Sequence, residues 1–263
     1  MRQARVAPGI DLLEAWFQGA AYRPHRHDTY AIGVTERGVQ AFNYRGEGHV
    51  SLPGDVAVLH PDELHDGFAG AAGGFGYRLI YVEPALIQAA VRDLMGKGAL
   101  LPFARQPVIR SHELVSAVRL AFDDASDVLA LDEVVLRLAE GLLEIVTPGA
   151  QRPSRYLDAG GVERARQLLD GVQDRVVRSW ELEAASGLSR YELARQFRAV
   201  AGTSPYRYSL LRRLDFARGL LATDRALAEI ALETGFADQA HFTRKFSAAY
   251  GLSPARYRKL IAG

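Results

Sequence analysis

The stretch GFADQAHFTRKFSAAYGLSP, residues 235–254, decides the fold of the C-terminal part of this chain. Its landmarks occur once before, because the spacing from Phe197 to Tyr208 matches the spacing from Phe246 to Tyr257 residue for residue, 49 positions earlier. A shared spacing of this length indicates a structural repeat. Each copy is predicted to fold as helix, tight turn and helix, the geometry that places a helix in a DNA major groove.

The predicted helix boundaries rest on local signals that both copies share. Gly187 and Gly235 fall where the first helix of each copy has to end, and glycine readily takes the positive φ of a sharp turn. Ser204-Pro205 and Ser253-Pro254 follow the copies and combine an N-cap with a proline in the first helical turn. These signals predict the same helix–turn–helix twice, each followed by a new helix.

The helix face opposite the phenylalanines is predicted to be exposed. Arg195 and Arg244 hold the same register, each two residues before a buried phenylalanine. Arginine at such a position can hydrogen-bond guanine O6 and N7, whereas the alternative is an arginine in solvent or in an ion pair. The repeat favours DNA contact. The predicted DNA-binding residues are Arg190, Tyr191, Ala194, Arg195, Arg198, Gln239, Ala240, His241, Arg244 and Lys245.

Residues 160–260 resemble the DNA-binding domain of AraC/XylS-type transcriptional regulators, most closely over the stretch quoted above. The family joins two helix-turn-helix units by one long helix, which Pro205 to Leu221 fits, with Leu210, Leu214 and Ala217 on its buried side. The resemblance implies a sequence-specific regulator of transcription that responds to a small-molecule effector. It further implies an activator, a homodimer, and contact with RNA polymerase.

Composition and charge limit the classes of function that the chain can have. The net charge is only +1, but residues 1–157 hold 15 basic and 19 acidic residues, whereas residues 158–263 hold 17 and 12. The basic excess therefore lies in the region of the repeat, as expected for a DNA-binding domain. With no cysteine, a disulfide framework and a thiolate site are excluded. Neither a signal peptide nor a membrane-spanning stretch is recognisable, so the chain is expected to be cytoplasmic.

The first half has the pattern of a small β-barrel. Between residues 10 and 83, short apolar runs alternate with glycines and prolines, and from Pro84 the pattern changes to helices over 85–95, 113–125 and 131–146. The apolar stripe of the last helix predicts either packing on the barrel or pairing with a second copy. The predicted fold class is α+β with two domains: a cupin-like effector-sensing and dimerisation barrel with trailing helices over 1–146, a linker over 147–157, and an all-α domain over 158–263.

Histidines mark the barrel as a sensor. His25 and His27 lie two residues apart, so both can point to one face of a strand, and His65 follows on a later strand. We predict that they hydrogen-bond an organic effector and that there is no metal cofactor. The alternative is a divalent metal on the three imidazoles, although the glutamate of metal-binding cupins is missing. The predicted effector-binding residues are His25, His27, Tyr30, His65, Arg78 and Tyr81.

Three functions remain open on the sequence. The first is an effector-responsive regulator, and the second is a metal-dependent cupin enzyme that carries a DNA-binding module. The third is a regulator without an effector, whose barrel serves only for dimerisation. We recognise no nucleophile–base pair, phosphate-binding loop or pair of catalytic carboxylates, so the sequence predicts that the protein is not an enzyme.

Overall fold

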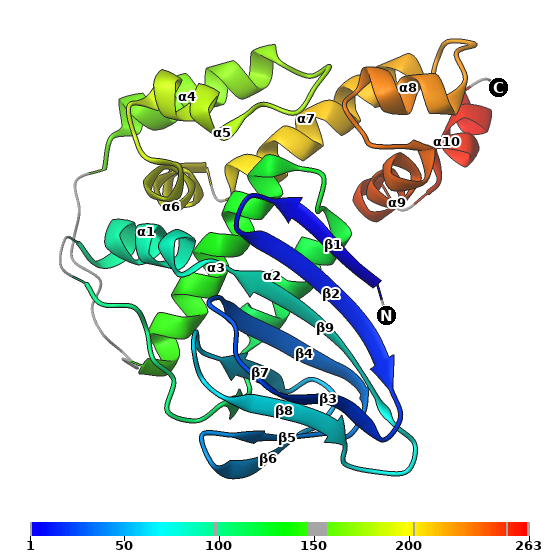
Figure 1. The fold of residues 1–263 in the computed structure, drawn as a ribbon. Helices are drawn as coiled ribbons and strands as arrows, with labels where there is room; N and C mark the ends of the chain where they lie inside the picture. Colours follow the sequence, from blue (N-terminus) through cyan, green and yellow to red (C-terminus); the bar gives the residue numbers. More distant parts are fainter. Residues whose placement is uncertain (1, 97–98, 147–156, 202, 251, 262–263) are drawn as a thin grey trace. The chain divides into compact units, whose positions relative to one another are not determined.

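The computed structural model describes residues 2–96, 99–146, 157–201, 203–250 and 252–261. The chain divides into two compact units, one rich in strands and one of helices (Figure 1). The predicted linker, residues 147–157, lies outside the described residues except for Leu157. No helix in the described ranges is long and apolar enough to cross a membrane. Unit 1 comprises Met1–Ala125 and Ala130–Arg155, and unit 2 comprises Ser126–Leu129 and Tyr156–Gly263.

The strands of unit 1 form two antiparallel sheets that enclose a shared core, as predicted for a small barrel (Figure 1). The larger sheet has the strand order β1-β2-β9-β4-β7-β10, and the smaller has the order β3-β8-β5-β6. The strands are β1 (Arg2–Ala7), β2 (Ile10–Phe17), β3 (Ala20–His25), β4 (Tyr30–Gly38), β5 (Gln40–Tyr44), β6 (Glu47–Ser51), β7 (Val56–Leu59), β8 (His65–Ala69), β9 (Phe75–Val82) and β10 (Val108–Ile109).

Strand β9 shows how the sequence divides its side chains between two faces. It pairs with β2 on one side and β4 on the other, so it is central in its sheet. Successive side chains of a strand point to opposite faces. Tyr77 and Leu79 belong to the core between the two sheets, with Tyr81 packed against it. Ile80 and Val82, both fully buried, lie on the opposite face of the strand, on which helix α2 (His112–Asp123) packs.

Three helices follow the barrel strands, as the change of period predicts. Their bounds are α1 (Pro84–Met95), α2 (His112–Asp123) and α3 (Val128–Val146). The apolar stripe of α3 is buried within the chain, since Val134, Leu138 and Leu142 have no exposed surface. Gly141 lets α3 approach α2 closely, because a Cβ at this position would lie 2.7 Å from Leu114 Cδ2. Packing, and not pairing with a second copy, therefore uses this stripe.

Unit 2 contains the two predicted helix-turn-helix pairs. The first is α5 with α6, the second is α8 with α9, and the long helix α7 joins them, as expected from the family resemblance (Figure 1). The predicted buried side of α7 is confirmed, because Leu210, Leu214 and Ala217 are all buried. The helices are α4 (Ala159–Gly171), α5 (Ser179–Ser186), α6 (Arg190–Ala201), α7 (Pro205–Leu220), α8 (Leu227–Glu233), α9 (Gln239–Tyr250) and α10 (Pro254–Ile261).

The repeat in the sequence is also a repeat of contacts. The rings of Phe197 and Tyr208 meet edge to face at 5.5 Å, and those of Phe246 and Tyr257 meet in the same way at 5.6 Å. In each copy the phenylalanine comes from the second helix of the motif, and the tyrosine from the helix that follows. The contact therefore fixes the recognition helix against its successor in both copies.

The predicted N-caps are also present. Ser204 Oγ accepts a hydrogen bond from the backbone N–H of Arg207 at 3.3 Å, and Ser253 Oγ accepts one from Arg256 at the same distance. Asp238 caps α9, since its Oδ1 accepts from the backbone N–H of His241 at 2.6 Å. These caps satisfy donors that the first turn of a helix leaves without partners.

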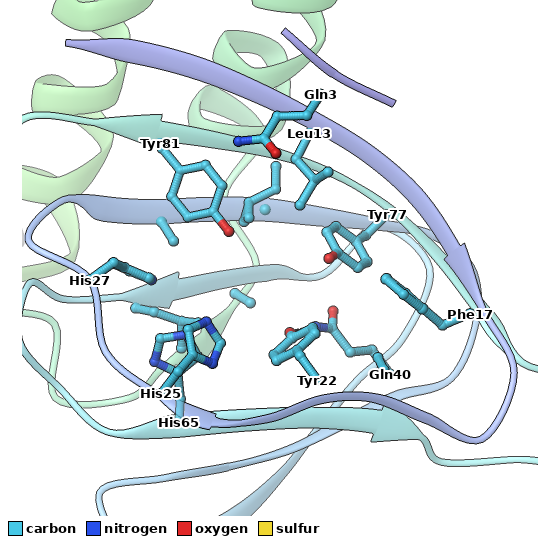
Figure 2. Close-up of a pocket in the computed structure, with 16 residues that line it drawn as sticks. Gln3, Leu13, Phe17, Tyr22, His25, His27, Gln40, His65, Tyr77 and Tyr81 are labelled. Atoms are coloured by element: carbon cyan, nitrogen blue, oxygen red, sulfur yellow. The ribbon is translucent and has the colours of Figure 1, made fainter. Parts of the chain in front are cut away.

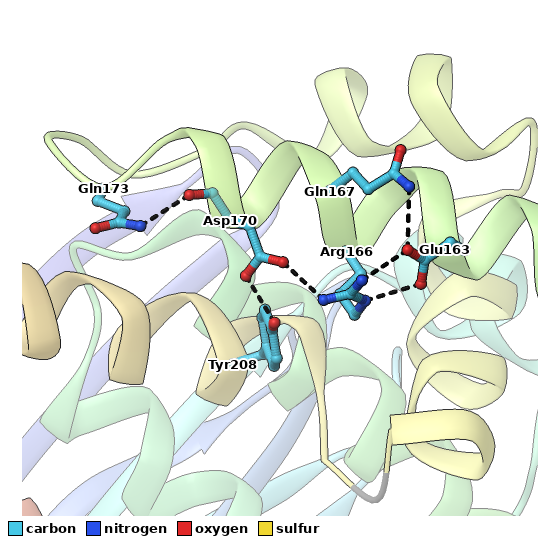
Figure 3. A network of polar contacts seen from close by, with 6 residues as sticks. All are labelled: Glu163, Arg166, Gln167, Asp170, Gln173 and Tyr208. Atoms are coloured by element: carbon cyan, nitrogen blue, oxygen red, sulfur yellow. Dashed lines mark hydrogen bonds and ion pairs between the residues drawn. The ribbon is translucent and has the colours of Figure 1, made fainter.

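A polar network fixes α7 on α4 (Figure 3). The Tyr208 hydroxyl donates to Asp170 Oδ1 at 2.7 Å, and the other carboxylate oxygen of Asp170 accepts from Arg166 Nη1 at 2.8 Å. Arg166 also donates to both carboxylate oxygens of Glu163. Tyr208 thus joins an apolar contact with Phe197 to a charge-assisted hydrogen bond, and it sets the position of the first motif on its linking helix.

The two turn glycines allow a matched test of the fold. Both have a positive φ, 76° at Gly187 and 73° at Gly235, so alanine at either position strains the backbone. At Gly235 the new Cβ would also lie 2.9 Å from Arg175 Cα, whereas at Gly187 it would meet nothing within 4 Å. We expect Gly187→Ala to lower the free energy of unfolding of unit 2 by about 1 kcal/mol, and Gly235→Ala to lower it clearly more. Urea unfolding followed by circular dichroism checks this, and equal effects would contradict the close approach.

Candidate functional site

A cavity lies between the two sheets of unit 1. Its volume is about 250 Å³, and its lining comes from eight strands and the segment after β3 (Figure 2). Histidines gather at one end, while aromatic side chains and a glutamine lie at the other. The lining side chains with polar or aromatic groups are Gln3, Phe17, Tyr22, His25, His27, Gln40, His65, Tyr77 and Tyr81.

The three histidines of the cavity form one cluster. The ring centroids of His25 and His65 are 4.4 Å apart, those of His27 and His65 are 4.8 Å apart, and those of His25 and His27 are 6.1 Å apart. His25 and His65 are paired across β3 and β8, which places them side by side. The three residues lie in one place, as predicted, but strand alternation does not bring His25 and His27 together, because β3 ends at His25 and His27 follows it.

Each of these imidazoles is held by its Nδ1 atom. The Nδ1 of His25 lies 2.9 Å from the carbonyl oxygen of Arg23, that of His27 2.8 Å from Thr29, and that of His65 2.9 Å from Glu63. A carbonyl oxygen can only accept a hydrogen bond, so Nδ1 carries a proton, and in a neutral ring Nε2 then carries the lone pair. Each neutral ring of the cluster thus presents its Nε2 atom as a hydrogen-bond acceptor.

Burial keeps two members of the cluster uncharged. The pKa of the His65 imidazole is lowered by burial to about 4, and burial also lowers the pKa of His27. Both rings are therefore neutral near pH 7, and their Nε2 atoms remain acceptors. His27 Nε2 is buried and has no hydrogen-bond partner among the described residues.

The aromatic wall supplies donors. Burial raises the pKa of Tyr22 to about 12, and it raises the pKa of Tyr77 and of Tyr81 above the usual value for a phenol. These hydroxyls therefore stay protonated and are able to donate. Tyr22 contacts His25 edge to face at 5.3 Å, and Tyr81 contacts His27 in the same way at 5.3 Å. In the part of the chain that the structure describes, no Lys, Arg, Asp or Glu lines the cavity.

The metal alternative finds no assembled site. Among the described residues, no group of three His, Cys, Asp or Glu side chains is arranged to hold a metal ion. The absence of a metal cofactor stays a prediction from the sequence.

Two predicted effector residues do not line the cavity. Tyr30 is buried and its hydroxyl donates to the carbonyl oxygen of Pro102 at 2.9 Å. Arg78 lies on the opposite face of β9 from Tyr77, where its Nε donates to Glu14 Oε1 at 2.9 Å and its guanidinium lies over the Phe122 ring. Neither residue lines this cavity, because both occupy the other face of their strands, and effector contact by Tyr30 or Arg78 stays a prediction from the sequence.

Five polar or aromatic residues of the cavity were missed, namely Gln3, Phe17, Tyr22, Gln40 and Tyr77. For Tyr77 a signal was present, because it lies four residues before Tyr81 in a strand and so shares its face. The place of Tyr22 in the cavity depends on the fold and not on local spacing. Its ring lies over Gly67, where a Cβ would come within 2.3 Å of the ring carbon Cζ. Only glycine at that position leaves room for the tyrosine.

The recognition helices of unit 2 expose part of their predicted DNA-binding faces. On α9, Gln239, Ala240 and Arg244 are exposed and Lys245 is half-buried. His241 is buried and its ring contacts Phe236 at 5.5 Å, so its predicted exposure is wrong. The exposed end of α9 is thus formed by side chains of Gln239, Ala240 and Arg244.

On α6 the structure departs further from the expected face. Arg190 is exposed, and Arg195 and Arg198 are half-buried. Tyr191 and Ala194 are only 4% exposed each, so the exposure predicted for them is wrong in this structure. The Nε and Nη2 atoms of Arg195 have no hydrogen-bond acceptor among the described residues. DNA contact by any of these ten residues remains a prediction.

Comparisons with known proteins agree with both units. The AraC-like ligand binding domain matches residues 7–143, and a helix-turn-helix domain matches residues 182–260. The uncharacterized HTH-type transcriptional regulator YbfI of Bacillus subtilis is 28% identical over 91% of this chain and 89% of its own length. The HTH-type transcriptional activator RhaS of Klebsiella pneumoniae is 26% identical over 94% of this chain and 91% of its own.

Among solved structures, a transcriptional regulator from Chromobacterium violaceum, described as an AraC-type DNA-binding domain-containing protein, is 28% identical. It covers 38% of this chain and 90% of that one, with a TM-score of 0.36. The ligand-domain match spans more than half of the chain, and the repeat and its contacts stand in unit 2 where the helix-turn-helix match lies. The chain belongs to the AraC family of transcriptional regulators.

Proposed function

We propose that this protein is an effector-responsive transcription activator, which binds double-stranded DNA through α6 and α9 and a small molecule in the cavity of unit 1. The observation that carries the proposal is the repeated helix-turn-helix, in which the same phenylalanine–tyrosine contact fixes both recognition helices. The ligand-domain match and the cavity support an effector. The name of the RhaS relative, an activator, supports activation.

The two motifs are proposed to read neighbouring segments of one DNA face. Helix α7 has 16 residues, so it is about 24 Å long and separates the two motifs in space. Recognition helices of paired motifs enter successive major-groove segments about one helical turn apart. On α9, Arg244 is exposed and free to reach a guanine edge.

Family membership also supports a homodimer and contact with RNA polymerase, which we include in the proposal. An effector changes the output of such a regulator only if it binds one arrangement of the protein more tightly than another. We propose no catalytic activity, since the relatives are transcriptional regulators.

DNA selection with the purified full-length protein tests this function directly. We expect enrichment of a motif with two sub-sites about one helical turn apart. The affinity for the selected site should fall steeply between two salt concentrations, because phosphate contacts release counterions. If neither the protein nor its C-terminal fragment enriches any sequence, the DNA-binding proposal is wrong.

Arg244→Ala tests one base contact. On the selected site we expect the variant to lose about 1–3 kcal/mol of binding free energy and to relax specificity at one base pair. Fluorescence anisotropy with site variants measures both. Arg105→Ala, which removes an exposed arginine from unit 1, is the charge-matched control and should bind as the wild type does. Unchanged specificity in Arg244→Ala would show that this arginine does not read a base.

A further inference from the structure

The histidine end of the cavity consists of acceptors without donors. The carbonyl oxygens of Arg23, Thr29 and Glu63 hold the Nδ1 protons of the three imidazoles, so Nε2 of the neutral rings of His27 and His65 is left as an acceptor for an occupant of the cavity. Lone pairs cannot hydrogen-bond one another. Whatever occupies this end must therefore bring its own donors.

One of these acceptors lacks a hydrogen-bond donor within the part of the chain that the structure describes. His27 Nε2 is buried and lacks a partner among the described residues, and its ring lies 4.8 Å from that of His65. A buried acceptor without a hydrogen bond destabilises a protein, because it has lost its hydrogen bond to water and gained none in return. An occupant that donates to this nitrogen would remove that penalty, which favours its binding.

The charge of the lining limits the class of occupant. No acidic or basic side chain in the described part of the chain lines the cavity. A carboxylate would find no cation there and would face the imidazole lone pairs, so it is disfavoured. An ammonium group could receive the lone pairs, but no carboxylate would compensate its buried charge. A neutral molecule avoids both penalties.

The opposite end of the cavity fits a ring. Phe17 lies near Tyr22 and Tyr77, with ring centroids 6.3 Å and 6.1 Å apart, and the second pair is stacked (Figure 2). Aromatic walls of this kind bury the faces of flat or cyclic ligands. The Tyr22 hydroxyl accepts from Gln40 Nε2 at 3.4 Å and keeps its own proton to donate.

We propose that the effector is an uncharged ring compound with at least two neighbouring O–H or N–H donors, which it directs at Nε2 of His27 and His65. Its ring packs against Phe17, Tyr22 and Tyr77. This inference rests on the proposed function, because it names the chemical class that the sensing cavity takes. Anions and cations of the same size are excluded from the site.

Matched probes test the class. Catechol and cis-cyclohexane-1,2-diol are neutral and carry two adjacent hydroxyls, benzoate is the anion of similar size, and benzylammonium is the cation. Zn²⁺ alone represents the metal alternative. By ligand-observed NMR and thermal shift with the full chain, we expect at least one neutral diol to bind and neither charged probe to do so. Stronger binding of benzoate, benzylammonium or Zn²⁺, or no binding of either diol, overturns the proposal.

Variants locate the bound diol. His27→Leu and His65→Leu each remove one acceptor and should weaken diol binding at least about tenfold, the loss expected when one buried hydrogen bond goes. His112→Leu changes an exposed histidine of α2, away from the cavity lining, and should bind the diol as the wild type does. Diol binding that survives in both cavity variants contradicts the assignment.

The imidazole nitrogens supply a readout that needs no variant. Long-range ¹H–¹⁵N spectra of the wild type should show His25, His27 and His65 as the Nδ1–H form. Addition of the diol should shift the Nε2 signals of His27 and His65. Signals of Nε2–H tautomers, or Nε2 shifts that do not move with bound diol, overturn the proposal.

Failure of this inference can be told apart from failure of the proposed function. If DNA selection enriches a two-part motif and no neutral diol binds, the regulator stands and the effector class is wrong. If no DNA motif is enriched, the regulatory function itself is wrong, whatever the cavity binds.

Discussion

Phe246→Ala is expected to lower the free energy of unfolding of unit 2 by about 3–5 kcal/mol, which is the range for removing a buried phenylalanine. The side chain has no exposed surface. Its ring meets those of Phe242 at 5.5 Å, Tyr250 at 4.6 Å and Tyr257 at 5.6 Å, so alanine leaves a cavity among three aromatic neighbours. A loss of this size is a large part of the 5–15 kcal/mol that stabilises a typical domain.

Loss of DNA binding should accompany the loss of stability, because Phe246 holds α9 against α10. Urea unfolding of the full chain, followed by circular dichroism, measures the first effect, and anisotropy on the selected site measures the second. Leu232→Ala in α8 is the control: this leucine is 65% exposed, and its removal should change the stability by no more than about 0.5 kcal/mol. If both variants unfold alike, Phe246 is not the centre of the second motif.

The sequence predicted unit 2 well because its decisive signals are local. A turn glycine, a Ser-Pro cap and a phenylalanine every four residues each act within one or two helical turns. The structure has Gly187 and Gly235 at positive φ and caps at Ser204 and Ser253, as expected. The repeat strengthened each signal, because two copies had to agree.

The exposure of the recognition helices was harder to predict. Helical spacing places Tyr191 opposite the Leu193–Phe197 stripe, yet the structure buries it. His241 is buried against Phe236, a residue of the preceding turn that a helical wheel of α9 does not contain. Exposure depends on which other elements pack on a helix, and spacing within the helix carries no such information.

For the cavity too, some features could be predicted from local spacing and others depend on the fold. His25 and His27 both line the cavity, although His27 lies beyond the end of β3 and not within a strand. The choice of Tyr30 and Arg78 ignored that each lies on the other face from the cavity residues of its own strand. The register of β3 against β8 shifts between Tyr22 and His25, so no regular alternation predicts that both line the cavity. The protonation pattern of the imidazoles depends on backbone carbonyls, which the side-chain sequence does not reveal.

Unit 1 is expected to lose stability in acid through His60 and His65. Burial lowers the pKa of each imidazole to about 4, below the value of about 6.5 in an unfolded chain. Between these values the unfolded chain binds more protons than the folded one, so the stability is fully present above pH 6.5 and falls as the pH decreases towards 4. From pH 6.5 to pH 5, each histidine should lower the unfolding free energy by at most about 2 kcal/mol.

The surroundings of the two rings also help to keep the pKa of each imidazole low. His60 Nε2 accepts from the backbone N–H of Ala104 at 3.0 Å, and its Nδ1 is hydrogen-bonded to the Tyr44 hydroxyl at 2.9 Å. Protonation of Nε2 removes the acceptor that holds Ala104, and Arg45 nearby opposes the new charge. Around His65, the like charges that His25 and His27 would acquire oppose protonation, against a weaker attraction by Asp66.

His60→Gln isolates one of these contributions. The variant should be less stable at pH 7.5, but its unfolding free energy should depend less steeply on pH between 6.5 and 5, by about one proton. Tyr30→Phe is the matched control, because it breaks the hydrogen bond to Pro102 in the same loop and removes no imidazole. The pKa of Tyr30 is about 12, so this group does not titrate in the window. Tyr30→Phe should therefore be destabilised equally at both pH values, whereas an unchanged slope in His60→Gln would show that His60 does not set the acid sensitivity.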